Sequence, residues 1–171
     1  MQQMYMNEEI RYFEKRVLTE GLCKAYLPMK FIGVEGNEIA DIDTAGFKAL
    51  SCFELRNSIE AVTILEKCVL ALIDACGYLV DPKRMEFNIK TVFLSAGKKD
   101  VRFAFIPRAM PAENAVCLVR GLVDDMDKNI VRGEATSYLR ACASYLPECE
   151  SLFDLITFLS ELKEEINSCG A

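Results

Sequence analysis

One long apolar helix, predicted over residues 57–77, constrains the fold more than any other feature of this sequence. Its apolar side chains recur with a helical period from Ile59 to Cys76. Its charged residues are Glu60, Glu66, Lys67 and Asp74. Such a helix offers water only a narrow polar stripe, because most of its other positions are apolar. We therefore expect it to lie at the centre of the fold, mostly buried.

Both ends of this helix are marked in the sequence. Asn57 is a residue type that caps helix N-termini, and Glu60 follows three residues later in the register of a capping box. Gly77 marks the expected end, because glycine is favoured just beyond the last helical turn. The sequence thus predicts both the burial of the helix and its limits.

A β-hairpin is predicted before this helix. Its strands are residues 29–34 and 38–42, joined by a turn at Glu35-Gly36-Asn37. Nearer the N-terminus, residues 10–17 are expected to form a strand and residues 19–26 a short helix, which Pro28 ends. Residues 1–9 are expected to be loose or partly ordered, and residues 44–55 to form a linking segment in which a helical turn is allowed.

A second β-hairpin follows the apolar helix, and the last third of the sequence is helical. The hairpin strands are residues 91–95 and 101–106, which are rich in Val, Phe and Leu. The predicted helices are residues 113–127, 134–145 and 151–170, the last opened by Ser151 and Asp154. Strands come first and helices last, so we expect a single α+β domain of 171 residues. In it, a small antiparallel N-terminal β region and the second hairpin pack on a helical C-terminal half.

The composition excludes several kinds of chemistry. The sequence has no histidine, which is the commonest general base and zinc nitrogen ligand. Ser-His-Asp and Cys-His catalysis are therefore excluded. The net charge of −6 argues against binding to nucleic acid or to an anionic membrane surface. We expect no metal, no cofactor and no nucleic-acid partner.

The cysteines and the apolar runs bear on the compartment. None of the eight cysteines is spaced C-x-x-C, and four of them, Cys68, Cys76, Cys117 and Cys142, lie on apolar helical stripes. We interpret them as buried free thiols. The first twenty residues lack the apolar core of a signal peptide, and the longest apolar run, residues 68–73, is too short to span a bilayer. The expectation is a cytoplasmic protein without membrane insertion.

Several segments together resemble a known family. The segments are Tyr78-Leu79-Val80-Asp81-Pro82, Val92-Phe93-Leu94, residues 101–107, residues 16–22 and Ala40-Asp41-Ile42-Asp43. Their order and spacing, over about residues 10–165, resemble a bacterial domain family of unknown function that is commonly fused N-terminal to forkhead-associated domains. That family looks similar to the pseudokinase-like cytoplasmic domain of a type VII secretion component. This sequence itself shows neither a forkhead-associated module nor a transmembrane segment.

The resemblance implies a degenerate protein-kinase-like arrangement. A reduced N-lobe would occupy about residues 10–56 and a helical C-lobe about residues 57–170, with the second hairpin where a kinase carries its catalytic and metal-binding loops. In that comparison, Glu86 falls at the position of the catalytic Asp and Thr91 at that of the metal-binding Asn. Residues 104–106 replace the D-F-G motif and contain no carboxylate. Because phosphoryl transfer depends on bound metal, we predict no kinase activity.

Weaker candidates for chemistry are more simply structural. Gly33 and Gly36 fit a turn better than a phosphate-binding loop, and Lys30 fits a solvated strand position. Asp124, Asp125 and Asp127, with Glu134 further on, lack the alternating ligands of a Ca²⁺ loop and are interpreted as a solvated helix end. The pair Asp41 and Asp43 shares one strand face but has no partner for acid–base work. Cys23 beside Lys24 is the one cysteine in an electropositive setting.

Three hypotheses about function follow. The first is a non-catalytic protein-interaction or scaffolding module of pseudokinase-like type in bacterial signalling or secretion. It predicts a protein partner and leaves homo-oligomerisation open. Its candidate surfaces are the Arg108-Ala109-Met110 loop and the second hairpin. The second is a nucleotide- or small-ligand-binding pseudoenzyme, which needs a well-formed pocket. The third is an enzyme of unfamiliar type that uses Asp, Glu, Lys or Cys alone.

Overall fold

The computed structural model describes residues 2–6, 10–34 and 37–169. The strands are β1 (Gln2–Met6), β2 (Met29–Val34), β3 (Asn37–Ile42), β4 (Phe47–Ala49), β5 (Val92–Ser95) and β6 (Val101–Phe103). The α-helices are α1 (Tyr12–Glu20), α2 (Ser58–Cys76), α3 (Ala115–Asn129), α4 (Ala135–Tyr145) and α5 (Leu152–Cys169). Short 3₁₀ turns are η1 (Leu50–Cys52), η2 (Pro82–Arg84) and η3 (Leu146–Glu148). The α+β fold class, with the helices concentrated in the C-terminal half, is confirmed.

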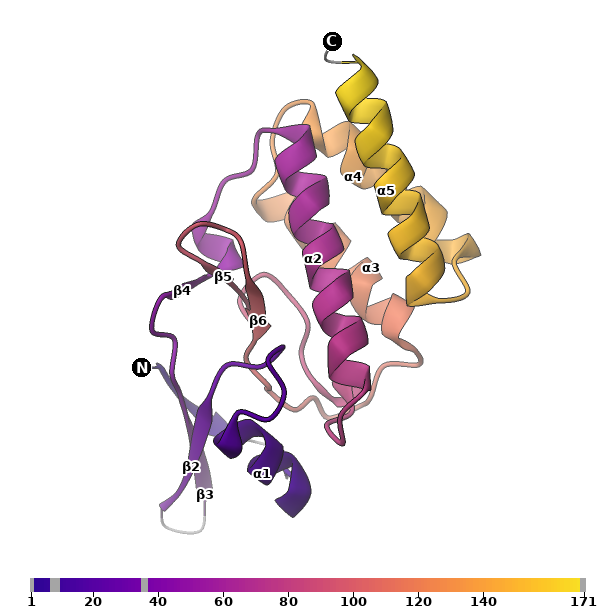
Figure 1. Cartoon of the computed structure of the whole chain (residues 1–171). Coiled ribbons are helices and arrows are strands. Elements are labelled where there is room, and N and C mark those ends of the chain that lie inside the picture. Colours follow the sequence, from indigo (N-terminus) through magenta and orange to yellow (C-terminus); the bar gives the residue numbers. More distant parts are fainter. Residues whose placement is uncertain (1, 7–9, 35–36, 170–171) are drawn as a thin grey trace.

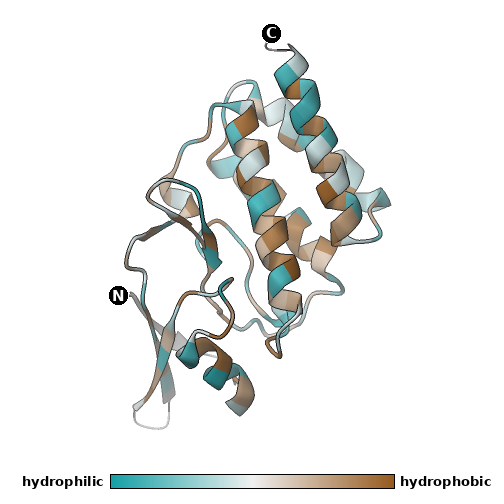
Figure 2. Ribbon diagram, in the orientation of Figure 1, coloured by the Kyte–Doolittle hydropathy of each residue, from teal (hydrophilic) through white to brown (hydrophobic). Residues whose placement is uncertain are grey.

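The apolar helix α2 lies at the centre of the structure, as its sequence predicts. It packs against α4 and β6 and runs beside α5 (Figure 1). One side of it is completely buried, including Val62, Leu65, Val69 and Leu72. Figure 2 shows hydrophobic residues along most of α2, interrupted by a few hydrophilic positions. The burial of these side chains provides the main stabilisation of the helical half.

The two ends of α2 differ in detail from the expected caps. The Asn57 side chain accepts a hydrogen bond from the Glu60 backbone N–H at 3.0 Å, so the N-cap is confirmed. The Glu60 carboxylate does not complete a capping box, since it accepts from the Lys98 ammonium at 2.6 Å instead. Gly77 ends the helix as predicted, but with φ of −75° it is right-handed and does not use glycine's freedom at positive φ.

The N-terminal sheet has the order β1-β3-β2 and is antiparallel throughout. Its β2–β3 pairing runs from Met29 opposite Ile42 to Val34 opposite Asn37, which confirms the first predicted hairpin. The turn residues Glu35 and Gly36 lie outside the described residues. Strand β1 pairs with β3, so residues 2–6 are ordered as a strand, which the sequence did not predict.

The second sheet has the order β4-β5-β6 and contains the second predicted hairpin. Strand β4, within the expected linking segment, was not predicted; it pairs with β5 from Phe47 opposite Ser95 to Ala49 opposite Phe93. Strand β6 ends at Phe103 and not at residue 106. The chain leaves the sheet there, and the Ala104 N–H donates to the Thr91 carbonyl at 2.9 Å.

The segment before the first hairpin is the main correction. Residues 12–20 form the helix α1 where a strand was expected, and its N-terminus is closed by a hydrogen bond of 2.8 Å from the Arg11 N–H to Glu14. Gly21, with φ of 64°, ends it in the left-handed conformation that favours glycine. The short helix expected at residues 19–26 is also wrong. Residues 25–27 run alongside β6, because Ala25 and Leu27 exchange backbone hydrogen bonds of 2.7 and 2.8 Å with Phe103.

Buried apolar residues of both sheets and of the helices belong to one hydrophobic cluster. It includes Leu18 of α1, Ile42 of β3, Phe103 of β6 and Leu159 of α5. Tyr26 and Phe103 meet edge to face in it, with ring centroids 6.2 Å apart. The N-terminal sheet therefore shares its core with the helical half. In the described part of the chain, no helix combines the length and the apolar character that crossing a membrane requires.

Candidate functional site

The loop of residues 86–91, between η2 and β5, contains Glu86 and Thr91, which the family resemblance aligns with the catalytic and metal-binding residues of a kinase. Thr91 is buried in this loop. As a hydrogen-bond donor, its hydroxyl lies 2.9 Å from the Glu86 carbonyl oxygen and 3.2 Å from the Asn88 carbonyl oxygen. The same oxygen accepts a hydrogen bond of 3.0 Å from the Asn88 N–H. The Thr91 hydroxyl therefore stabilises the loop from inside and does not face a ligand.

Two further side chains fix the 86–91 loop. The Asn88 side-chain oxygen accepts from the N–H groups of Lys90 and Thr91, at 2.9 and 3.2 Å. Asp125, on α3, accepts from the Ile89 N–H at 3.1 Å, while the Ile89 carbonyl accepts from the Ser51 N–H at 2.8 Å. The loop is thus fastened to α3 on one side and to η1 on the other. No local sequence pattern indicates this role of Asp125, because its partner lies 36 residues away.

Glu86 is the one carboxylate of the kinase-like comparison that remains at the surface. Its backbone N–H donates to the Ile106 carbonyl at 2.7 Å, which places it beside residues 104–106, the segment that the family resemblance aligns with the D-F-G motif. In that segment Ala104 and Phe105 are buried and Ile106 is half-buried, so their side chains belong to the core. Among the residues that the structure describes, no group of three His, Cys, Asp or Glu is arranged to hold a metal ion.

An open groove lies between the 86–91 loop, the 108–110 loop and α3. Its volume is about 780 Å³, and its walls include Glu86, Asn88, Arg108, Ala109, Met110, Cys117, Leu118, Gly121, Asp124, Asp125 and Lys128. Carboxylates and cations share this surface, and the Met110 side chain, 77% exposed, borders it. The groove therefore offers both charged groups and a flexible apolar side chain to a ligand.

Gly121 gives the groove part of its width. It lies within α3, where a glycine costs stability relative to alanine. A Cβ atom built on it would meet no heavy atom within 4 Å, so the backbone of α3 is accessible from the groove at this point. Packing within the protein does not require glycine here, since the space is empty. The position is therefore open to close approach by a ligand.

The 108–110 loop and the second hairpin, the two surfaces expected to bind a partner, differ in their exposure. The Arg108-Ala109-Met110 loop is exposed and borders the groove with Glu86. The strands of the second hairpin are largely buried, including Val92, Leu94 and Phe103, whereas its turn, residues 96–100, stays at the surface away from the groove. The structure thus brings Glu86 and the 108–110 loop together and leaves the hairpin strands in the core.

The acidic residues of α3 and Glu134 lie in different environments. Asp124 is exposed and borders the groove, and Asp125 fixes the 86–91 loop. The Asp127 carboxylate lies 3.5 Å from the Arg140 guanidinium of α4. Glu134 directly precedes α4 and lines another cavity. The interpretation as solvated residues at helix ends is therefore correct for Asp124 and Glu134, which are exposed, and wrong for Asp125 and Asp127, which are half-buried. These carboxylates do not converge on one ion.

The remaining candidates on the N-terminal sheet are separated by the structure. Asp41 is buried on β3, while Asp43 lies beyond the end of β3, where it accepts from the Ala45 N–H at 3.0 Å in a turn. They form no carboxylate pair. Lys30 and Gly33 are exposed on β2, with Lys30 opposite Asp41 in the register, and Gly36 lies outside the described residues.

The cysteines are mostly unsuited to nucleophilic chemistry. Cys23 is 2% exposed, and burial raises the pKa of its thiol, so the neighbouring Lys24 does not make it a reactive thiolate. Burial also raises the pKa of Cys68 and of Cys142 to about 12. The prediction of buried free thiols is correct for these two residues. It is wrong for Cys76, which is exposed, and for Cys117, which is half-buried.

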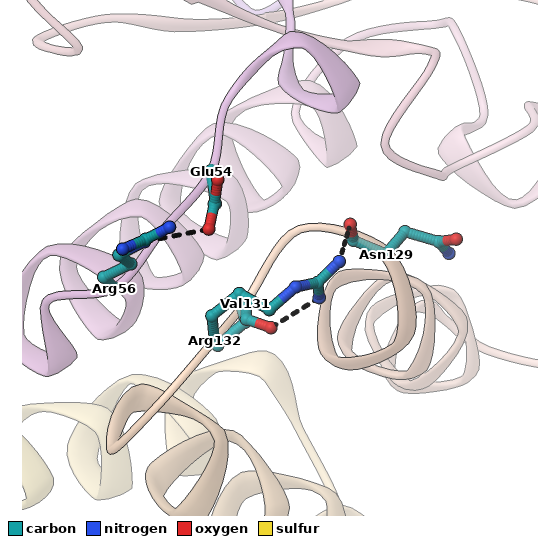
Figure 3. A network of polar contacts seen from close by, with 5 residues as sticks. All are labelled: Glu54, Arg56, Asn129, Val131 and Arg132. Atoms are coloured by element: carbon teal, nitrogen blue, oxygen red, sulfur yellow. Dashed lines mark hydrogen bonds and ion pairs between the residues drawn. The ribbon is translucent and has the colours of Figure 1, made fainter.

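The C-terminal end of α3, next to the groove residue Lys128, is fixed by a small polar network (Figure 3). The Arg132 guanidinium donates to the Val131 and Asn129 carbonyls at 2.7 and 2.9 Å. The backbone around Leu55 pairs with residues 130–132 through bonds of 2.8 and 2.9 Å. These contacts close the C-terminus of α3 and connect it to the segment that leads into α2, so α3 forms a firm wall for the groove.

Together these features define an α+β domain with an open groove of mixed charge, bordered by an 86–91 loop whose Thr91 and Asn88 side chains bind the backbone of the loop. No protein-family model and no curated protein matches the chain.

Proposed function

We propose that the chain is a non-catalytic protein-interaction module that binds a segment of a partner protein in the groove beside the 86–91 loop. The observation that carries the proposal is the use of the polar groups of this loop. The Thr91 hydroxyl and the Asn88 amide oxygen both bind backbone groups of the loop itself. A loop arranged in this way stabilises a surface and has little polar capacity left for chemistry.

The absence of kinase activity belongs to this proposal. Phosphoryl transfer requires metal ions that neutralise the charge of the transferred group. In the kinase-like comparison, Thr91 and residues 104–106 take the places of the metal ligands. The Thr91 hydroxyl is buried and occupied, and Ala104 and Phe105 are core residues. Glu86 alone cannot supply the missing charge neutralisation.

The groove has the properties of a site for an extended peptide segment. Met110 offers an adaptable apolar contact, Gly121 permits close backbone approach, and charges of both signs stand on the walls. A role in bacterial signalling or secretion follows from the family resemblance. A cytoplasmic location accords with the free thiols of the described cysteines, since such thiols persist in reducing compartments.

A peptide-display selection against the folded protein tests the proposal. Selected peptides should bind wild type, and their affinity for Gly121→Gln should be lower by at least about tenfold, because the added side chain projects into the groove. Phe153→Gln is the matched control, because Phe153 is 69% exposed on α5 and does not line the groove. Peptides that bind both variants as wild type would refute the groove as the site.

A nucleotide- or small-ligand-binding pseudoenzyme is the second candidate. Its support is the volume of the groove, about 780 Å³, which falls in the range of small-molecule sites. Thermal unfolding with millimolar ATP or GTP, with and without Mg²⁺, separates the two functions. The interaction module predicts no Mg²⁺-dependent shift in Tm. A shift that Gly121→Gln abolishes would favour the pseudoenzyme instead.

A further inference from the structure

A second, smaller pocket lies apart from the groove, between α2, the second hairpin and the segment before β2. Its volume is about 290 Å³, and it is lined by Lys24, Ala25, Lys67, Leu70, Ala71, Asp74, Lys99, Asp100, Val101 and Arg102. We call it the cationic pocket. Three separate segments of the chain contribute its four cations, and Leu70, Ala71 and Val101 provide an apolar part of the wall.

The charges of the cationic pocket balance one another only in part. Four cations and two carboxylates leave a net charge of +2, on a chain whose net charge is −6. Within the part of the chain that the structure describes, none of these six residues takes part in an ion pair. The ammonium groups of Lys24 and Lys99 have no hydrogen-bond partner there either. Such a concentration of unpaired positive charge attracts anions.

Two of the cations are held in place. The Lys67 ammonium donates to the Lys98 carbonyl at 2.9 Å. The Arg102 guanidinium lies over the Phe47 ring, 4.8 Å from its centroid, which restricts the orientation of the side chain. Fixing these groups before a ligand arrives reduces the entropy lost on binding.

The turn that carries Lys99 is also rigid. The Ser95 hydroxyl oxygen accepts from the N–H groups of Lys99 and Asp100, at 3.2 and 3.0 Å. Lys98 adopts a φ of 53°, the left-handed region that disfavours lysine, although Gly97 stands next to it. The Lys98 ammonium forms an ion pair with the Glu60 carboxylate at 2.6 Å, which also fixes this side chain. The turn therefore retains a strained residue, and the structure around it presents Lys99 at the edge of the pocket.

We propose that the cationic pocket binds a phosphate-type dianion. A net charge of +2 matches that of a phosphate monoester near neutral pH. Lysine and arginine together suit phosphate, because they combine point charges with a planar set of donors. The apolar wall accommodates the carbon atoms to which the phosphate is attached. This site is independent of the groove, since the two share no residue.

Titration with inorganic phosphate above its second pKa, where it is a dianion, followed by NMR chemical shifts at constant ionic strength, tests the proposal. We expect saturable shifts at residues of the cationic pocket and a loss of at least about tenfold in affinity for Lys99→Glu and for Lys24→Glu. Lys48→Glu and Lys90→Glu are the controls, because both lysines are exposed and line neither the pocket nor the groove.

The outcomes separate a built site from general electrostatic attraction. Equal weakening by the pocket and control variants, or no saturable shift at the pocket, would overturn the proposal. With phosphate binding established, a phosphoserine peptide and ATP identify the source of the phosphate. Tighter binding of the peptide assigns a modified partner protein, and tighter binding of ATP assigns a free nucleotide. Folding of each variant is checked by its far-UV circular dichroism.

Discussion

The Glu14 carboxylate and the Arg84 guanidinium form an ion pair with an Oε1–Nη1 distance of 2.5 Å, in which the Glu14 side chain is completely buried. Glu14 lies on α1, and Arg84 ends η2, two residues before Glu86. The other Glu14 oxygen accepts from the Arg11 N–H and closes the start of α1. One carboxylate thus fixes α1 locally and joins it to the segment that leads into the groove.

Breaking this pair should destabilise the protein strongly. Arg84→Met leaves the Glu14 carboxylate buried without its cation, and we expect the free energy of unfolding to fall by about 3–5 kcal/mol. Arg16→Met is the control, because Arg16 pairs with Glu20 on the same helix but both side chains are solvated. It should cost less than about 1 kcal/mol. Urea denaturation measures both variants; equal losses would show that burial of Glu14 does not matter.

The two adjacent aspartates of α3 allow a matched comparison at the groove. Asp125→Ala removes the acceptor of the buried Ile89 N–H, so we expect a loss of about 1–3 kcal/mol in unfolding free energy. Amide hydrogen exchange should also accelerate throughout the 86–91 loop. Asp124→Ala removes an exposed carboxylate and should change stability by less than about 0.5 kcal/mol. Unchanged exchange at Ile89 in Asp125→Ala would mean that other contacts hold the loop.

The central helix could be predicted from the sequence because its signal is physical and local. Its apolar residues repeat with a helical period, and Asn57 and Gly77 mark its ends. Tertiary packing buries the face that this pattern already defines. Helix α1 gives the opposite case. Tyr12, Phe13 and Val17 favour a strand locally, whereas the two bonds of Glu14 and the left-handed Gly21 favour a helix. Its contact with Arg84, 70 residues away, could not be read from the sequence.

The candidate site was only partly predictable for the same reason. Glu86 and the 108–110 loop were identified separately, but the wall that joins them into a groove comes from α3 through tertiary packing. Strand β4 has three residues and depends on its pairing with β5, so its own sequence carries little signal. Asp125 looked like a solvated acidic residue because nothing nearby in the sequence indicates its partner. Local patterns therefore predicted elements, and long-range contacts decided the site.

Two glycines should respond to alanine in opposite directions. Gly121→Ala adds a methyl group in open space within α3, and we expect it to stabilise the protein by about 0.4–1 kcal/mol. Gly133 has a φ of 67°, which disfavours any residue with a Cβ atom. Gly133→Ala should therefore cost about 1 kcal/mol or more. Tm values from calorimetry measure both changes; a loss of stability in Gly121→Ala would mean that the groove is narrower than the structure shows.

The buried thiols predict how stability depends on alkaline pH. Burial raises the pKa of Cys68 and Cys142 to about 12 from an ordinary value of 9.0, so the folded protein retains these protons where the unfolded chain releases them. The two protonated thiols contribute their full share of the unfolding free energy below about pH 8.5, and this share is lost as the pH rises toward 12. Unfolding free energies at pH 8 and pH 10 should differ more for wild type than for Cys68→Ala/Cys142→Ala. Cys52→Ala, at an exposed cysteine, should retain the wild-type difference. If the double variant loses as much stability between the two pH values as wild type, then other groups, such as the buried Tyr26 with its raised pKa, account for the dependence.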